Sequence, residues 1–192
     1  MTAFRSFAAA ATLAAAVSLG ACSQGDDSGA TATATGNADA GHRTLAATIG
    51  SAPGLTTVST ALSEAGLADV FDGPGSYTLL APDDDAFAKI DNKALTDPAN
   101  RAELVAVLRG HILPGHLTPD AIKKAIADKK GPVQMRTLAD SMVTFSADGD
   151  VLTATGADGA KAKIDGAALV ASNGVVLPLD GLVKSATPAK AS

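Results

Sequence analysis

The feature that most constrains the fold is a change of hydrophobic period near Pro132. Before this residue, apolar side chains recur at helical spacing, as in the segment 55–65. After it, short segments of alternating apolar and polar residues are separated by Asp-Gly pairs at 148–149 and 158–159, which are hairpin signals. Helices followed by hairpins predict an α+β domain, with N-terminal helices packed against a C-terminal antiparallel β-meander.

Helix boundaries can be predicted from capping residues. Asp97 followed by Pro98 predicts the start of one helix, and Thr118 followed by Pro119 predicts the start of another. Gly131 is expected to end this second helix, since glycine readily takes the left-handed conformation at a helix C-terminus.

Strands are predicted by short apolar or alternating segments. The apolar segment 76–82 is expected to be a buried strand that Pro82 ends. Beyond Pro132 the expected strands lie within 133–138, 142–147, 151–156, 160–165 and 168–173. The segment 174–185 predicts a closing pair of apolar strands.

The N-terminus has the features of an export signal. Arg5 precedes an uncharged apolar run over 7–19, which is too short to span a membrane comfortably and is typical of a signal peptide. The run ends in Leu-Gly-Ala-Cys, which resembles the lipobox of bacterial lipoproteins. We therefore expect residues 1–21 to be a lipoprotein signal peptide and Cys22, the only cysteine, to be acylated, for example with palmitate. The alternative is an ordinary secretory signal cleaved nearby, with Cys22 left as a free thiol.

The remaining organisation follows from composition. Residues 22–43 hold the lipidated cysteine and a linker without large apolar side chains, 44–185 form the domain, and 186–192 are expected to be a disordered tail. Because Ser23 rather than Asp follows the cysteine, a lipid-anchored location at the outer membrane, on its periplasmic or surface face, is expected. A net charge of −5 and only 3% aromatic residues argue against a nucleic-acid partner.

Four segments, taken in order, resemble the signatures of the fasciclin domain. They are "YTLLAPDDDAF" (77–87), "LVAVLRGHILPG" (104–115), "TLADSMVTFS" (137–146) and "ASNGVVLPLDGLV" (171–183). The resemblance covers about residues 44–185 and implies a fasciclin-like α+β fold.

The resemblance also implies which residues build the motifs. These are Ala81, Pro82, Asp85, Phe87, His111, Pro114, Gly115, Asn173, Gly174 and Asp180. His111 corresponds to a buried structural histidine, for which Asp85 or the backbone of the last motif are candidate hydrogen-bond partners. The sequence departs from the family at Gly110, where a tyrosine is usual, at Asp84, where an asparagine is usual, and at Leu177, where a histidine is usual. Without that tyrosine, an integrin-type adhesive epitope is not expected.

The chemistry-bearing residues do not assemble into a catalytic or metal motif. His111 and His116 could suggest a zinc site, but zinc needs three or four ligands, no further cysteine is available, and His116 lies beyond Pro114 and Gly115, where the chain turns. The acids at 83–85 lack a calcium-loop pattern and are expected to begin a helix, and Asp180 is expected to anchor its own backbone. We predict no enzyme activity, no metal and no cofactor.

These observations favour a non-catalytic adhesion or protein-interaction module anchored in the cell envelope. Its membrane attachment would be the lipid on Cys22, and its protein or extracellular-matrix partner is unknown. Exposed apolar patches are expected around 113–122 and 133–142. The alternatives are a periplasmic carrier of a small apolar ligand held in a groove between helices and sheet, an envelope accessory protein, and an envelope protein with a purely structural role.

Overall fold

The computed structural model describes residues 42–89 and 97–184, all within one compact unit. The predicted signal peptide, Cys22, most of the linker and the tail lie outside the described residues. No helix among the described residues is long and apolar enough to cross a membrane. The helices are α1 (Leu45–Ser51), α2 (Thr56–Glu64), α3 (Asp84–Ala88), α5 (Arg101–Gly110) and α6 (Pro119–Lys129), with 3-10 turns η2 (Ala68–Phe71) and η3 (Pro98–Asn100).

The described strands form two sheets. Sheet A has the order β2 (Ile112–Pro114), β1 (Tyr77–Pro82), β8 (Gly174–Leu179) and β7 (Leu169–Ala171). Sheet B has the order β3 (Val133–Arg136), β4 (Met142–Asp148), β5 (Val151–Thr155) and β6 (Lys161–Lys163), and every pairing in it is antiparallel. The α+β prediction is confirmed.

The pairing of β8 corrects the predicted meander. β8 lies parallel to β1 in sheet A, with Leu79 opposite Val176, so the C-terminal strands do not form one antiparallel meander. The segment 180–184 is not a strand either, so the predicted closing pair reduces to β8 alone. Both β1 and β8 are buried along nearly their whole length, as expected for parallel strands covered on both faces.

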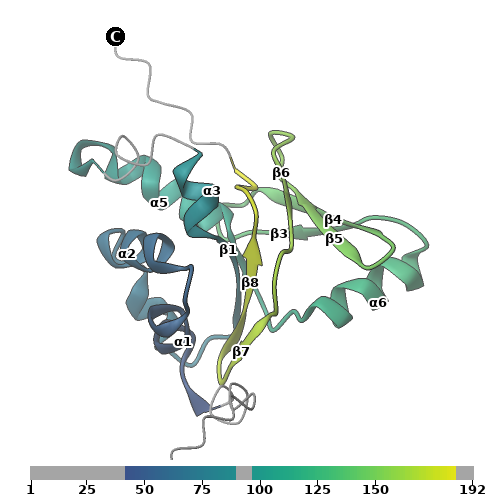
Figure 1. The fold of residues 1–192 in the computed structure, drawn as a ribbon, viewed down its shortest axis with the longest axis horizontal. Helices are drawn as coiled ribbons and strands as arrows, with labels where there is room; N and C mark the ends of the chain where they lie inside the picture. Colours follow the sequence, from purple (N-terminus) through teal and green to yellow (C-terminus); the bar gives the residue numbers. More distant parts are fainter. Residues whose placement is uncertain (1–41, 90–96, 185–192) are drawn as a thin grey trace, which may run out of the picture. The chain divides into compact units, whose positions relative to one another are not determined.

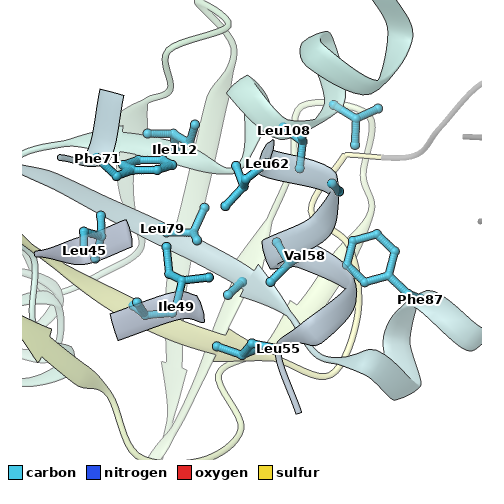
Figure 2. Packing of buried hydrophobic residues seen from close by; sticks show 14 of the residues in the cluster. Leu45, Ile49, Leu55, Val58, Leu62, Phe71, Leu79, Phe87, Leu108 and Ile112 are labelled. Carbon is cyan, nitrogen blue, oxygen red and sulfur yellow. The ribbon is translucent and has the colours of Figure 1, made fainter. Parts of the chain in front are cut away.

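Sheet A lies between the helices α1, α2 and α5 and the layer of sheet B with α6 (Figure 1). It therefore separates two hydrophobic cores. On one side, α1, α2 and α5 pack their apolar faces against Leu79 (Figure 2). Val176 of β8 belongs to the same cluster. On the other side, Leu80 and Leu177 meet Phe145 of sheet B and Ile122 of α6. The helices therefore cover one face of sheet A, and sheet B with α6 covers the other.

The capping signals are found where the sequence predicts them. Asp97 accepts a hydrogen bond from the Ala99 amide and begins η3, which leads into α5. Thr118 accepts from the Ala121 amide and begins α6. At the end of α6 the left-handed residue is Lys130, with φ 56°, rather than the predicted Gly131.

Candidate functional site

His111 lies at the corner between α5 and β2 and is 1% exposed. Its Nδ1 is 2.9 Å from the Val107 carbonyl oxygen, and its Nε2 accepts a hydrogen bond from the Val183 amide at 3.1 Å. Because Nε2 accepts, Nδ1 carries the proton and donates to Val107. The backbone of the last motif thus binds the ring, whereas the other candidate partner, Asp85, is exposed on α3.

The ring is held in its neutral form. Burial lowers the pKa of His111 to about 4, although the hydrogen bond to Val107 and the negative charge of Asp158 act in the opposite direction. Both nitrogens are engaged by the backbone, and His116 is exposed beyond the turn. The described residues contain no group of three or more His, Cys, Asp or Glu side chains that could hold a metal ion.

Thr78 fixes the turn at Pro114 and Gly115 against β1. Its buried hydroxyl donates to the Gly115 carbonyl and accepts from the Leu117 amide, both at 2.8 Å. Gly115 has φ 98°, which glycine adopts without strain, whereas Pro114 is exposed. Thr78 was not among the predicted site residues, although a polar residue inside an otherwise apolar strand is a signal for a buried hydrogen-bonding role.

Asn173 joins three segments that are distant in sequence. Its Oδ1 accepts from the Leu45 amide at 2.7 Å, at the start of α1. Its Nδ2 donates to the carbonyls of Phe71 at 2.7 Å and Gly73 at 2.9 Å, and its own carbonyl accepts from the Tyr77 amide. The next residue, Gly174, lies so close to the Tyr77 carbonyl that a Cβ there would clash with it.

The three acids of the first motif have different roles. Asp83 accepts from the Ala86 amide and caps α3. Asp84 accepts from the amides of Thr57 at 2.7 Å and Thr56 at 3.3 Å, so it caps the start of α2 from a different helix. These hydrogen bonds, that from the Thr57 amide first, lower the pKa of Asp84. Asp85 is exposed, so the acid that joins elements is Asp84 rather than the Asp85 named from the sequence.

The other motif residues also join the chain to itself. Ala81, Pro82 and Phe87 are buried, with Phe87 in the core beneath the helices. Asp180 was expected to anchor its own backbone; instead, its carboxylate accepts from the Lys163 amide at 2.7 Å. The Asp180 amide in turn donates to the Lys163 carbonyl, which ties the end of β6 to the segment after β8.

The comparisons with known proteins agree with this geometry. The model of the fasciclin domain matches residues 53–184. The chain belongs to the fasciclin domain family. It is 32% identical over 131 residues to transforming growth factor-beta-induced protein ig-h3 of Sus scrofa. The matched segment covers 66% of this chain but only 17% of that protein. It is 29% identical over 133 residues to protein sll1483 of Synechocystis, covering 67% of this chain and 66% of that one.

A solved structure supports the fold independently. The chain resembles a FAS1 domain pair from the insect cell adhesion molecule fasciclin I, with a TM-score of 0.60 and 14% identity over 74% of this chain and 51% of that one. The prediction of a fasciclin-like α+β fold is therefore confirmed. Fasciclin domains are a family of cell-adhesion and protein-interaction modules, and nothing in these comparisons points to a catalytic activity.

This fasciclin domain lacks the aromatic ring expected before the central histidine. Gly110 is buried, and a Cβ there would come within 2.7 Å of the Lys184 Cδ. The aliphatic part of Lys184 therefore covers the position that a tyrosine would need. This chain has no tyrosine next to His111 with which to form an adhesive surface.

The predicted apolar patches are only partly exposed. In the region 113–122, Leu113 and Ile122 are fully buried, and in the region 133–142 only Met142 is clearly exposed, at 37%. Between the helices and sheet A, core side chains fill the space in which a carrier would need its groove (Figure 2). A hollow of about 340 Å³ lies between α5 and the turn 138–140, and one of about 380 Å³ lies on the open face of sheet B.

Proposed function

We propose that this chain is an exported, cell-envelope-anchored fasciclin-domain protein that acts as a non-catalytic adhesion or protein-interaction module. Membership of the fasciclin family supports adhesion as the class of function. One observation supports the proposal that the module is non-catalytic. Three polar side chains of the motifs, those of His111, Thr78 and Asn173, are used in hydrogen bonds within the chain. Recognition is then left to the outer surface.

The proposed anchor is an acylated Cys22, with the domain held at the outer membrane by the linker that follows. The lipobox-like sequence and the absence of any other cysteine support this part of the proposal. A linker of this composition has a mean reach of roughly 25 Å as a flexible coil, which would hold the domain close to the membrane.

Fractionation of cells that express the full chain tests the anchor. We expect the wild type in the outer-membrane fraction, extracted only by detergent, and Cys22→Ala in the soluble envelope fraction. Metabolic labelling with a fatty-acid analogue should mark the wild type alone. A wild type that is soluble and unlabelled would contradict lipid anchoring.

Binding of the purified Cys22→Ala chain to cells that lack the protein tests the adhesive role. We expect binding that saturates and is competed by unlabelled chain. A chain that shows no saturable binding, and instead copurifies with a defined apolar metabolite, would contradict adhesion and support the carrier.

A further inference from the structure

The outward face of sheet B has an unusual polar composition. Strand alternation points Val143, Phe145, Leu152 and Ala154 into the core, where each is at most 3% exposed. The opposite face carries hydroxyl, amide and cationic side chains along its middle, with Met142 at one end and Asp148 and Val151 at the other. We define the hydroxyl face as Gln134, Thr144, Ser146, Thr153, Thr155, Lys161 and Lys163.

The strand register arranges these side chains in two rows across the sheet. In one row Gln134 is opposite Thr144, Thr144 opposite Thr155, and Thr155 opposite Lys161. In the other row Ser146 is opposite Thr153, and Thr153 is opposite Lys163. The rows are about 7 Å apart, and neighbouring side chains within a row are about 5 Å apart. Each row ends in a lysine.

Five of these seven residues line a hollow of about 380 Å³. Its lining comprises Ser146, Thr153, Thr155, Lys161, Ala162, Lys163 and Asp180. In the described part of the chain, neither lysine forms an ion pair, whereas Lys123, Lys124 and Arg136 do. Asp180 is the one acid in the lining, and its carboxylate already accepts from the Lys163 amide. The hollow thus offers cations in a protein whose net charge is −5.

From this arrangement we propose that the hydroxyl face binds an anionic polysaccharide, with sugar hydroxyls on the serine and threonine hydroxyls and sugar carboxylates on Lys161 and Lys163. This inference rests on the proposed adhesive function and names the class of its partner. Hydroxyls suit sugars because each can both donate and accept a hydrogen bond. The two ammonium groups complement carboxylates that recur along a polyuronate chain.

Other partner classes fit this face less well. A protein interface would need large apolar or aromatic anchors at its centre, whereas the exposed apolar residues of this face, Met142 and Val151, lie at its opposite ends. A single-stranded nucleic acid would need aromatic rings for base stacking, and the hollow has none.

Binding of the full-length chain in detergent to immobilised alginate, a polyuronate, tests the proposal. We expect saturable binding that weakens as salt is raised, and binding to the neutral polymer dextran about tenfold weaker. Lys161→Gln/Lys163→Gln should lose about tenfold or more in alginate affinity. The matched control Lys124→Gln/Lys129→Gln removes the same charge from α6, on the far side of sheet B, and should stay within about twofold.

A second pair of variants separates sugar recognition from charge alone. Thr153→Val/Thr155→Val keeps both lysines and the strand shape, and should weaken alginate binding about threefold or more while the thermal midpoint stays within a few degrees. Poly-glutamate, an acidic peptide, should bind more weakly than alginate and should not respond to the valine pair.

Three results would overturn the proposal. The first is that the wild type does not bind alginate. The second is that the α6 control loses as much alginate affinity as the Lys161→Gln/Lys163→Gln variant. The third is that poly-glutamate binds as tightly as alginate and that the Thr153→Val/Thr155→Val variant binds alginate as well as the wild type does. The cell-binding assay separates this inference from the proposed function. Saturable cell binding that the Lys161→Gln/Lys163→Gln variant retains would overturn the inference alone. If the protein with both lysines intact shows no saturable binding to cells, the adhesive function itself is overturned.

Discussion

At the scale of single residues, polar side chains of the motifs act as links between distant segments. Thr78, His111 and Asn173 each form hydrogen bonds with backbone groups in other parts of the chain. A buried backbone group without a partner costs about as much free energy as a lost hydrogen bond. The side chains of Thr78, His111 and Asn173 therefore stabilise the fold by pairing backbone groups where segments distant in sequence come together.

His111 should make stability depend on pH. Its pKa is about 4 in the folded chain against an ordinary value of 6.5, so between these values the unfolded chain binds a proton that the folded chain does not. The free energy of unfolding should therefore fall as pH is lowered from about 6.5 to about 4, by up to about 3 kcal/mol. Below that range both states are protonated and this contribution levels off. Urea unfolding at several pH values measures it.

The control for this prediction is His111→Gln, which is less stable at neutral pH but has no imidazole to protonate. The wild type and this variant should converge as pH falls through the same range. Parallel stability curves for the two proteins would show that His111 does not contribute as described.

At the scale of helices and strands, elements are stabilised by residues that belong to other elements. Asp84 of α3 caps α2 through the amides of Thr56 and Thr57. Asp84→Ala should lower the free energy of unfolding by about 1 kcal/mol at neutral pH, whereas Asp85→Ala, the neighbouring exposed acid, should change it by less than about 0.5 kcal/mol. Asp84→Asn keeps an acceptor and should cost less than alanine.

The contribution of Asp84 should also depend on pH. Its pKa is lowered in the folded state from the ordinary value of 3.8. Its contribution to the free energy of unfolding is therefore fully present when the pH is above 3.8, and it is lost as the pH falls through the lower pKa of the folded state. Chemical denaturation of the three variants at neutral and acid pH measures both effects. Equal effects of Asp84→Ala and Asp85→Ala would contradict the assignment of the cap.

The contact between β1 and β8 gives a further prediction. A Cβ at Gly174 would clash with the Tyr77 carbonyl, so Gly174→Ala should destabilise the chain by about 2 kcal/mol or more. The control is Gly131→Ala, because a Cβ at Gly131 meets nothing within 4 Å, and its effect should lie within about 1 kcal/mol of zero. Thermal unfolding of both variants measures the difference. A similar loss in the two would contradict the close approach.

Local signals predicted the elements but not all of their partners. The capping residues Asp97 and Thr118 and the Asp-Gly turns are read within a few residues of sequence, so they mark helix starts and hairpins correctly. The parallel pairing of β1 with β8 joins the two halves of the domain, and no local pattern encodes it. Asp85 was named from the family resemblance, whereas Asp84 is the acid that reaches α2. Which of the three consecutive acids does so depends on where α3 begins.

At the scale of the whole domain, sheet A is the layer on which both cores depend. Its strands come from both halves of the chain, and its two faces are covered by the helices and by sheet B with α6. Three of the signature segments meet at this sheet and at its ends, whereas the segment 137–146 enters β4 of sheet B and supplies Thr144 and Ser146 to its outward face. The motif side chains Thr78, His111 and Asn173 bind within the chain, and the surface that we propose for recognition is the outward face of sheet B.

NMR spectroscopy of the His111 ring nitrogens tests the packing role of the motif side chains most directly, because a recognition or metal site would need that ring to be accessible. If the motif serves packing, long-range proton–nitrogen spectra should show one neutral form, protonated on Nδ1, from about pH 8 to about pH 5, and zinc should not change it. A ring that titrates near its ordinary value, or whose nitrogens shift when zinc is added, would contradict a purely architectural role for the motif.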